Sequence, residues 1–154
     1  MLLQQTVGEI MSTPVLSVTP STTLREAVQL LSDHHISGLP VVDAGGQLIG
    51  ELTEQDLMVR ESGFNAGPYV MFLDSIIYLR NPLRWDRQVH QVLGNIVRDL
   101  MHNETHRCLP SLPLPQAASQ LHDHGTQRLI VVDSGYPIGI ITRGDVVRAL
   151  ASQA

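Results

Sequence analysis

The sequence predicts an α+β fold in which a unit of the order β-α-β-β-α occurs twice and the two copies pack sheet to sheet with pseudo-twofold symmetry. Two observations support this prediction. A shift of 90 positions, which takes Val7 to Val97, brings residues 41–43 into register with the identical residues 131–133. Within each copy, short apolar runs bounded by turn residues alternate with apolar residues at helical spacing.

The first half of the first copy is predicted to contain a short strand and a helix. Residues 15–18 form a short, mainly apolar run that favours a strand. Thr23 can cap a helix because Glu26 follows it at the spacing of a capping box. From Leu24 onward apolar residues recur on one helical face, and the helix is expected to end near His34-His35.

The second half of the first copy is predicted to contain a β-hairpin and a further helix. Residues 39–42 and 48–52 are apolar runs, and the turn sequence Asp43-Ala44-Gly45-Gly46 lies between them. A second helix is expected to open at Thr53. The four elements after the first strand are therefore one helix, two paired strands and a second helix.

The second copy runs from about Val97 to Ala151 and is expected to repeat this order with two differences. Ile130 stands where the first copy has Pro40. Pro113 and Pro115 crowd the start of its first helix. Because proline is tolerated only in the first helical turn, we expect this helix to begin late.

Three segments follow from the repeat: residues 1–59 as the first repeat, 60–96 as an insertion, and 97–154 as the second repeat. A repeat of about fifty residues buries little surface alone, so the two are expected to share a core. The insertion holds five of the six aromatic residues, and it is expected to pack on that core or to contact another subunit. Apolar spacing predicts a helix in it, marked by Val89, Val92, Leu93 and Ile96.

Composition and charge exclude several classes of function. The net charge is −5, so bulk charge supplies no attraction to nucleic acid, and no apolar run is long enough to cross a membrane. All ten basic residues are Arg, which excludes lysine Schiff bases and the lysine of a P-loop. The single Cys108 forms no internal disulfide, and the N-terminus lacks the pattern of a signal peptide. We therefore expect a cytoplasmic protein that binds neither nucleic acid nor membrane.

A repeated motif resembles that of a known family. Residues 50–56 and 139–145 share the pattern G-x-x-T-x-x-D, and this resembles the motif of CBS domains, named after cystathionine β-synthase. Thr13-Pro14-Val15 and residues 36–43 and 128–133 extend the resemblance to nearly the whole chain outside the insertion. The chain thus resembles a tandem CBS pair, or Bateman module. This implies clefts between the copies that bind adenosine-containing ligands such as AMP, ADP, ATP or S-adenosylmethionine.

The polar residues of the motif have side chains that suit a nucleotide. Thr53 and Thr142 are expected at strand-to-helix junctions, where their hydroxyls and the free N–H groups of the helix start can hold a phosphate. Asp56 and Asp145 accept hydrogen bonds when ionised, so each can bind both ribose hydroxyls. The alternative is that T-x-x-D is only a helix cap. The two roles can be combined.

The adenine is expected to lie among apolar groups and backbone edges in the two clefts. The residues predicted for one cleft are Leu16, Ser37, Gly38, Leu39, Pro40 and Leu52, and those for the other are His106, Gln127, Arg128, Leu129 and Ile141.

The two sites are expected to differ in charge. Beside the threonine, Arg143 stands where the first copy has Glu54. A unit charge at about 4 Å is worth on the order of several kcal/mol in a partly buried site. We therefore expect the Asp145 site to bind phosphate better, and the Asp56 site to prefer a short or uncharged tail or to stay empty.

Other combinations of residues favour no chemistry. His122-Asp123-His124 and His34-His35 lack the i, i+4 spacing that places two ligands on one helix face, so no metal site is expected. His106 and Cys108 share one face of a predicted strand but lack a third orienting group, which favours a buried thiol. We expect a homodimeric regulatory module without enzymatic activity that acts on an unknown partner protein. The alternative is a structural scaffold that no longer binds nucleotide.

Overall fold

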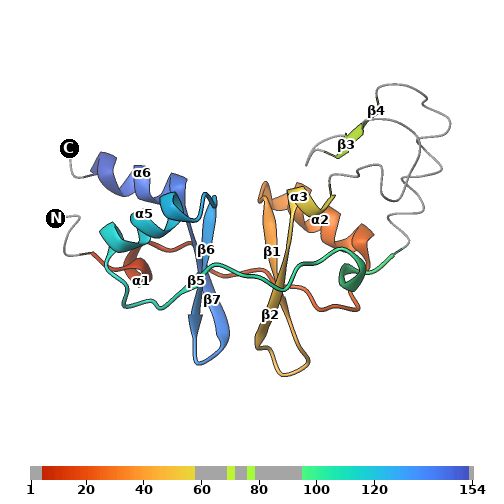
Figure 1. Cartoon of the computed structure of the whole chain (residues 1–154), viewed down its shortest axis with the longest axis horizontal. Helices are drawn as coiled ribbons and strands as arrows, with labels where there is room; N and C mark the ends of the chain where they lie inside the picture. The colour runs from red at the N-terminus through yellow and green to blue at the C-terminus, as the bar shows by residue number, and fades with distance from the viewer. Residues whose placement is uncertain (1–4, 58–68, 72–75, 79–94, 153–154) are drawn as a thin grey trace. The chain divides into compact units, whose positions relative to one another are not determined.

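The computed structural model describes residues 5–57, 69–71, 76–78 and 95–152, which fold as two compact units (Figure 1). The first-repeat unit comprises residues 17–44 and 49–103. The second-repeat unit comprises residues 1–16, 45–48 and 104–154. Each unit therefore contains most of one repeat together with the N-terminal segment of the other.

The first-repeat unit contains two small pairs of strands and short helices. The strands β1 and β2 form one sheet, and β3 and β4 form a separate antiparallel pair. The elements are α2 (Leu24–His34), β1 (Gly38–Val42), β2 (Leu48–Thr53), α3 (Glu54–Leu57), β3 (Tyr69–Met71), β4 (Ile76–Tyr78) and the 3-10 helix η2 (Val97–Asp99). The predicted hairpin and the helix that opens after Thr53 are confirmed.

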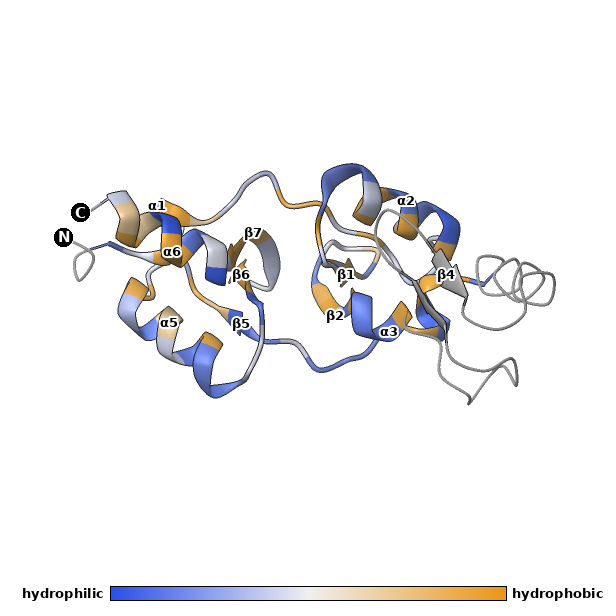
Figure 2. Cartoon of the chain, turned by 90° about the horizontal axis from the view of Figure 1, so that it is seen from above, coloured by the Kyte–Doolittle hydropathy of each residue, from blue (hydrophilic) through white to orange (hydrophobic). Residues whose placement is uncertain are grey.

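Helix α2 begins and ends where its sequence predicts. The hydroxyl of Thr23 accepts a hydrogen bond from the Glu26 N–H at 3.1 Å, which satisfies one free donor of the first turn. The helix ends at His34, and His35 adopts a left-handed conformation with φ of 52°. Hydrophobic and hydrophilic residues alternate along the helix (Figure 2), and its apolar face is fully buried at Leu24, Ala27 and Leu31.

The strand predicted at residues 15–18 does not form. Only Val18 pairs, in an isolated parallel bridge to Val41. Its N–H donates to the Pro40 carbonyl at 3.0 Å, and its carbonyl accepts from the Val42 N–H at 2.8 Å. The boundary between the two units falls between Leu16 and Ser17. The run is therefore divided between the two units.

The second-repeat unit contains a three-stranded sheet and helices. The strand order is β5-β6-β7, with β5 parallel to β6 and β6 antiparallel to β7. Its elements are α1 (Val7–Ile10), β5 (Arg107–Cys108), α5 (Leu114–Asp123), β6 (Arg128–Asp133), β7 (Tyr136–Thr142) and α6 (Arg143–Ser152). Together the two units confirm the mixed α+β class and the repeated order of helix, hairpin and helix.

Helix α5 does not begin late, so that prediction is wrong. It starts at Leu114, the counterpart of Leu24 in the repeat register. Pro113 takes the N-cap position in an extended conformation, and Pro115 lies in the first turn. Both prolines are tolerated because the N–H groups at these positions have no partner within a helix.

The N-terminal segment of each repeat packs on the unit of the other repeat. We call residues 6–12 and 96–102 the exchange segments. Each contains a short helical turn, and the first residue of each turn, Val7 or Val97, is fully buried. The Val7 N–H donates to the Leu112 carbonyl at 2.9 Å, and the Val97 N–H donates to the Thr22 carbonyl at 2.8 Å. Since residues 112 and 22 are also repeat counterparts, the same contact forms twice.

Most of the insertion lies outside the described residues. The helix predicted from Val89, Val92, Leu93 and Ile96 falls there except for Ile96, which is extended and precedes η2, so the rest of that prediction is untested. The described part includes the β3–β4 pair, in which Tyr69 pairs with Tyr78 and Met71 with Ile76. This pair was not predicted from the sequence.

Candidate functional site

In the first repeat, the T-x-x-D pattern spans the junction of β2 and α3. Thr53 is the last residue of β2, and Asp56 lies in the first turn of α3. The Thr53 N–H donates to Asp56 Oδ2 at 2.8 Å, and the Thr53 hydroxyl donates to the same oxygen at 3.2 Å. The Asp56 carboxylate thus accepts both hydrogen bonds at the start of α3.

In the second repeat, the same pattern spans the junction of β7 and α6. The Thr142 N–H donates to Asp145 Oδ2 at 2.9 Å, and the Asp145 N–H donates to Thr142 Oγ1 at 3.1 Å. These reciprocal bonds satisfy two donors of the helix start, as in a capping box. The helix-capping interpretation of the motif therefore applies to both repeats, and the aspartates are held in place before any ligand arrives.

The exchange segments bring a third residue to each aspartate. His102 pairs with Glu51 through backbone hydrogen bonds of 2.9 and 3.0 Å, and Ser12 pairs with Ile140 through bonds of 2.8 and 3.2 Å. Ser12 and His102 are repeat counterparts. Neither Ser12 nor His102 was predicted as a site residue from the sequence. The available signal was the repeat register, which pairs Met11 with Met101 and therefore also pairs the residues that follow them.

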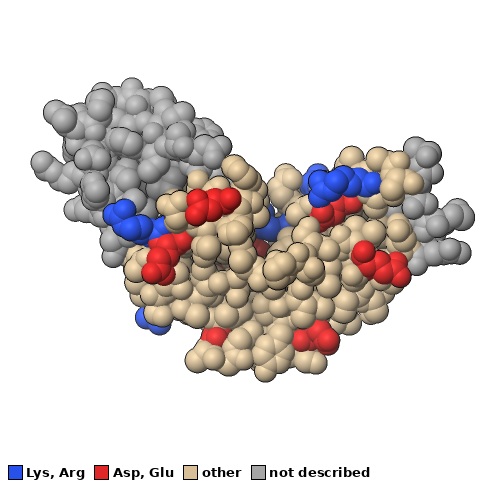
Figure 3. All heavy atoms as spheres, turned by 180° about the vertical axis from the view of Figure 1, so that it is seen from behind, with Lys and Arg blue, Asp and Glu red and all other residues tan. Residues whose placement is uncertain are grey.

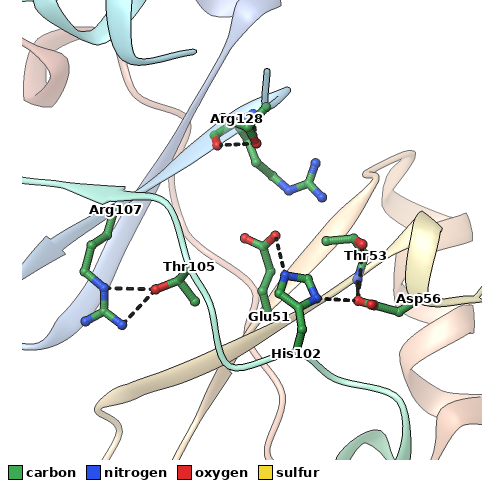
Figure 4. A network of polar contacts seen from close by, with 8 residues as sticks. Glu51, Thr53, Asp56, His102, Thr105, Arg107 and Arg128 are labelled. Atoms are coloured by element: carbon green, nitrogen blue, oxygen red, sulfur yellow. Dashed lines mark hydrogen bonds and ion pairs between the residues drawn. The ribbon is translucent and has the colours of Figure 1, made fainter. Parts of the chain in front are cut away.

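His102 lies between two carboxylates of the first-repeat unit (Figure 4). Its Nδ1 is 2.8 Å from Asp56 Oδ2, and its Nε2 is 3.8 Å from Glu51 Oε1. A carboxylate only accepts hydrogen bonds, so Nδ1 is the donor to Asp56. The His102 side chain is 38% exposed, whereas that of Asp56 is 17% exposed. The ring therefore covers the aspartate and still has access to solvent.

Asp145 in the second-repeat unit has different partners. The Ser12 hydroxyl donates to its two carboxylate oxygens over 3.3 and 3.5 Å, near the outer limit for a hydrogen bond. The guanidinium of Arg148 forms an ion pair with Oδ1 from one turn further along α6. The Arg148 side chain is 71% exposed, whereas that of Asp145 is only 6% exposed, so an exposed guanidinium pairs with a buried carboxylate. The cation at Asp145 thus comes from its own helix.

The glycine of the motif permits the close approach of the exchange segment. A Cβ atom on Gly50 would lie 2.7 Å from the His102 carbonyl oxygen and 2.5 Å from the Met101 methyl group. A Cβ atom on Gly139 would overlap Met11 and lie 3.2 Å from the Ser12 carbonyl oxygen. The motif therefore begins with a residue that has no side chain, because the exchange segment passes directly over it.

The residues predicted around the first site are divided between the units. Ser37 lies beside the start of α3, because its carbonyl accepts a hydrogen bond from the Glu54 N–H at 2.9 Å. Residues 38–40 belong to β1, and the side chains of Leu39 and Leu52 are fully buried. These two therefore present only backbone edges to a ligand. Leu16 was predicted for the same site but belongs to the second-repeat unit.

The residues predicted around the second site all belong to the second-repeat unit. The Gln127 carbonyl accepts from the Arg143 N–H at 3.1 Å, which reproduces the contact between Ser37 and Glu54 in the other repeat. Arg128 is the first residue of β6, and the side chains of Leu129 and Ile141 are fully buried. The ring of His106 stacks on His124 with ring centroids 4.6 Å apart.

Arg143 has a structural role that sequence analysis did not anticipate. Its Nε donates to the Thr126 carbonyl at 2.9 Å, and its Nη2 donates to the Leu121 carbonyl at 3.0 Å. Leu121 lies in the last turn of α5 and Thr126 follows the helix by three residues, and a cation is stabilising near the C-terminal end of a helix. The guanidinium expected beside a phosphate is therefore bonded to the protein backbone.

The described part of the chain also bears on a metal site, a reactive thiol and a membrane span. Among these residues no group of three or more His, Cys, Asp or Glu side chains could hold a metal ion. Cys108 is buried, and burial raises the pKa of its thiol to about 11. No described helix has both the length and the apolar composition needed to cross a bilayer. On the face shown in Figure 3, acidic and basic side chains are interspersed among uncharged residues.

Known proteins similar to this chain share both repeats. A family model described as "CBS domain" matches residues 7–63 and 97–152. The CBS domain-containing protein CBSX1 of Arabidopsis thaliana, named as chloroplastic, is 36% identical over 151 residues, which cover 94% of this chain. The chain spans only 63% of the length of that relative.

Solved structures show the same fold. The structure titled as CBSX2 in complex with AMP is 30% identical, with a TM-score of 0.70 and coverage of 97% of this chain and 98% of that one. A second structure of CBSX2, from Arabidopsis thaliana, matches with a TM-score of 0.75 over 97% of this chain and 96% of the other. With both repeats matched and the motif present in each, this chain belongs to the CBS domain family and contains a tandem pair of CBS domains.

Proposed function

We propose that this chain is a regulatory module that binds an adenine nucleotide through the T-x-x-D motifs of its two repeats. The observation that carries the proposal is that both repeats hold an aspartate at the same helix start, through the Thr53–Asp56 and Thr142–Asp145 hydrogen bonds. The complex of the related CBSX2 with AMP supports this ligand class.

Each part of a nucleotide has a complementary group in the motif. The aspartate accepts hydrogen bonds from the ribose hydroxyls, because an ionised carboxylate has about four acceptor positions. The threonine hydroxyl and the N–H groups at the start of α3 or α6 bind the phosphate. Backbone edges beside Ser37 or Gln127 contact the adenine. AMP, ADP, ATP and S-adenosylmethionine all carry the adenosine that these groups recognise.

The two sites are proposed to differ in their preference for phosphate. The second-repeat unit has two arginines on α6. Arg143 is bonded to the Thr126 and Leu121 carbonyls and contributes only its charge, whereas the exposed Arg148 can exchange its ion pair with Asp145 for one with an anion. The start of α3 instead carries Glu54. The Asp145 site is therefore the better phosphate site, and the Asp56 site takes a ligand with a shorter or uncharged tail.

The regulatory output is proposed to pass to a partner protein. An inosine-5'-monophosphate dehydrogenase of Nitrosopumilus maritimus is 26% identical over 140 residues, and the match covers 23% of that enzyme's length. A CBS pair therefore occurs beside a catalytic domain in a relative. In this chain, ligand binding favours one arrangement of the repeats and changes the surface offered to the partner. The pair itself catalyses no reaction.

Two further parts of the proposal concern assembly and location. Val147 and Leu150 are exposed apolar residues three positions apart on α6, and they support a homodimer that covers this face. Chromatography with light scattering would test that state. A cytoplasmic location remains a prediction from the sequence, and immunolocalisation of the native protein would test it.

A melting-temperature screen tests ligand binding against the alternative of a scaffold that binds no nucleotide. A ligand at 100 times its Kd should stabilise the folded protein by about 2.7 kcal/mol. The screen uses AMP, ADP, ATP, NAD and S-adenosylmethionine, with inosine monophosphate as a control for the base. No stabilisation by any adenosine ligand would favour the scaffold.

Titration of aspartate variants tests the difference between the sites. AMP and ATP are titrated into Asp56→Ala and Asp145→Ala proteins, after circular dichroism has confirmed that both are folded. Asp145→Ala should lose more ATP affinity than Asp56→Ala does. Equal losses from both changes would contradict unequal sites.

A further inference from the structure

The clearest chemical difference between the two repeats lies at position 12 of the first exchange segment and its counterpart, position 102. His102 contacts Asp56 at 2.8 Å, whereas Ser12 contacts Asp145 only at 3.3 and 3.5 Å. The backbone bridges that hold these two residues are alike. The difference is therefore one of side chain and not of how the segment is placed.

The hydrogen bonds to Asp56 converge on one carboxylate oxygen. Oδ2 accepts from the Thr53 N–H, the Thr53 hydroxyl and the His102 ring. A carboxylate has about four acceptor positions, shared by its two oxygens. Three donors therefore saturate Asp56 Oδ2. Two ribose hydroxyls can bind both oxygens at once only if one of the three donors leaves.

His102 is the donor that can leave. Both Thr53 donors are fixed by the junction of β2 and α3, three residues from Asp56. The His102 side chain comes from a separate segment and is 38% exposed, so its ring can turn into solvent. The cost is one hydrogen bond to a charged group, which is stronger than a hydrogen bond between neutral groups.

Asp145 has different competitors, the Ser12 hydroxyl and the Arg148 guanidinium. The Ser12 hydroxyl lies near the outer limit of hydrogen-bond distance, and it can also accept a bond, so it need not leave when ribose binds. Arg148 forms an ion pair with Oδ1, and its 71% exposed guanidinium can turn into solvent, although the Asp145 side chain that it would leave is only 6% exposed.

We propose that His102 is a specificity-determining residue that competes with ribose for Asp56 and so weakens ligand binding at the first site. The inference rests on the proposed function, in which the two aspartates bind ribose. It adds that His102, which limits ligand binding at Asp56, belongs to the second repeat. The Asp56 site therefore fills at a higher ligand concentration than it would without the His102 ring.

The test exchanges the two counterpart residues in the full chain. AMP is titrated calorimetrically into the wild-type protein and into His102→Ser, His102→Asn and Ser12→His variants. His102→Ser copies the second repeat and should tighten the first site about tenfold. His102→Asn keeps an N–H donor near the position of Nδ1 and should stay within about threefold of wild type. Ser12→His, at an exposed position, should weaken the second site.

Two controls assign the effect to ribose at Asp56. In an Asp56→Asn background, His102→Ser should give no gain, because the competed acceptor has changed. The ligand 2′,3′-dideoxy-AMP lacks the ribose hydroxyls, so His102→Ser should not tighten its binding. Melting temperatures show whether each variant is folded.

The outcomes separate this inference from the proposed function. If neither wild type nor any folded variant binds AMP, the proposed function fails, and this inference fails with it. If wild type binds AMP but His102→Ser leaves both sites unchanged, only the role of His102 is overturned. A gain that persists with Asp56→Asn or with the dideoxy ligand also overturns it. If the first site binds AMP in His102→Ser but not in the wild type, this would support strong competition by His102.

Discussion

The imidazole Nδ1 of His102 lies 2.8 Å from Asp56 Oδ2, although 46 residues separate the two along the chain. The contact exists because the exchange segment at residues 96–102 packs on the unit that contains the first repeat's motif. Its counterpart brings Ser12 to Asp145 across 133 positions. Each motif aspartate is thus covered by a residue from the other repeat, and the stability of both units depends on how these segments are held.

The cap of α2 should contribute measurably to stability. Thr23→Ala removes the acceptor for the Glu26 N–H and should lower the free energy of unfolding by about 1 kcal/mol. Thr23→Ser keeps the hydroxyl and should change it by a few tenths of that amount. Urea unfolding followed by circular dichroism measures both. Equal stability of the two variants would show that the hydroxyl does not cap this helix.

The glycine at the start of each motif should tolerate alanine unequally. Gly50→Ala places a methyl group against the His102 carbonyl, which is backbone and cannot turn aside, so we expect a loss of about 2 to 3 kcal/mol. Gly139→Ala meets mainly the flexible Met11 side chain and should cost less. Gly144→Ala, a helical position with nothing closer than 3.3 Å, is the control and should be neutral or stabilising.

Denaturant midpoints of these three glycine variants give the order of stability. A Gly50→Ala protein as stable as the Gly144→Ala protein would mean that the exchange segment does not pass over β2 as closely as described.

Arg143 should stabilise the end of α5. Arg143→Ala removes the donors to the Leu121 and Thr126 carbonyls, and the expected loss is about 1 kcal/mol because the side chain is exposed. Arg143→Lys keeps the charge without the forked donors and should recover only part of it. Arg107→Ala is a control, since that guanidinium bonds only to Thr105 in the described structure (Figure 4). Thermal unfolding would reveal a structural role, and equal effects of the alanine variants would argue against it.

Cys108 should be unreactive in the folded protein. Burial raises its pKa from 9.0 to about 11, so little thiolate is present near neutral pH and reaction with a disulfide reagent should be slow until the protein unfolds. The stabilisation from the neutral buried thiol is fully present below pH 9 and is lost as the pH rises toward 11.

Comparison with Cys108→Ala isolates this pH dependence. Wild type should lose up to about 1.4 kcal/mol more than the variant for each pH unit in that window. Equal pH profiles above pH 9, or rapid labelling of the native protein, would contradict a buried thiol.

Local patterns predicted the elements well where short-range chemistry determines them. The bounds of α2 follow from the Thr23 cap and the apolar spacing after Leu24, and the β1–β2 hairpin follows from the turn at 43–46. The predicted late start of α5 is wrong, although the rule that proline is tolerated only in the first helical turn holds. Pro113 and Pro115 occupy positions where a missing N–H costs nothing, so the helix begins in the same register as its counterpart.

The strand predicted at residues 15–18 does not form. A local pattern does not show this, because strand pairing depends on residues that are distant in the sequence. Within the run only Val18 has a bridge partner, Val41, and the run is divided between the two units after Leu16. The roles of Arg143 and His102 were missed for a similar reason. Their partners lie 17 to 22 and 46 residues away, beyond the reach of helix or strand periodicity.

The amino-acid sequence by itself determined the twofold repeat, the α+β class and the T-x-x-D motifs, because these depend on periodicity and on contacts within a few residues. Only the tertiary structure decided that the N-terminal segment of each repeat packs on the other unit. That exchange buries Val7 and Val97 and satisfies backbone groups that a single repeat leaves open. It also places His102 on Asp56 and Ser12 on Asp145, and the difference between the two sites follows from this pairing of distant residues.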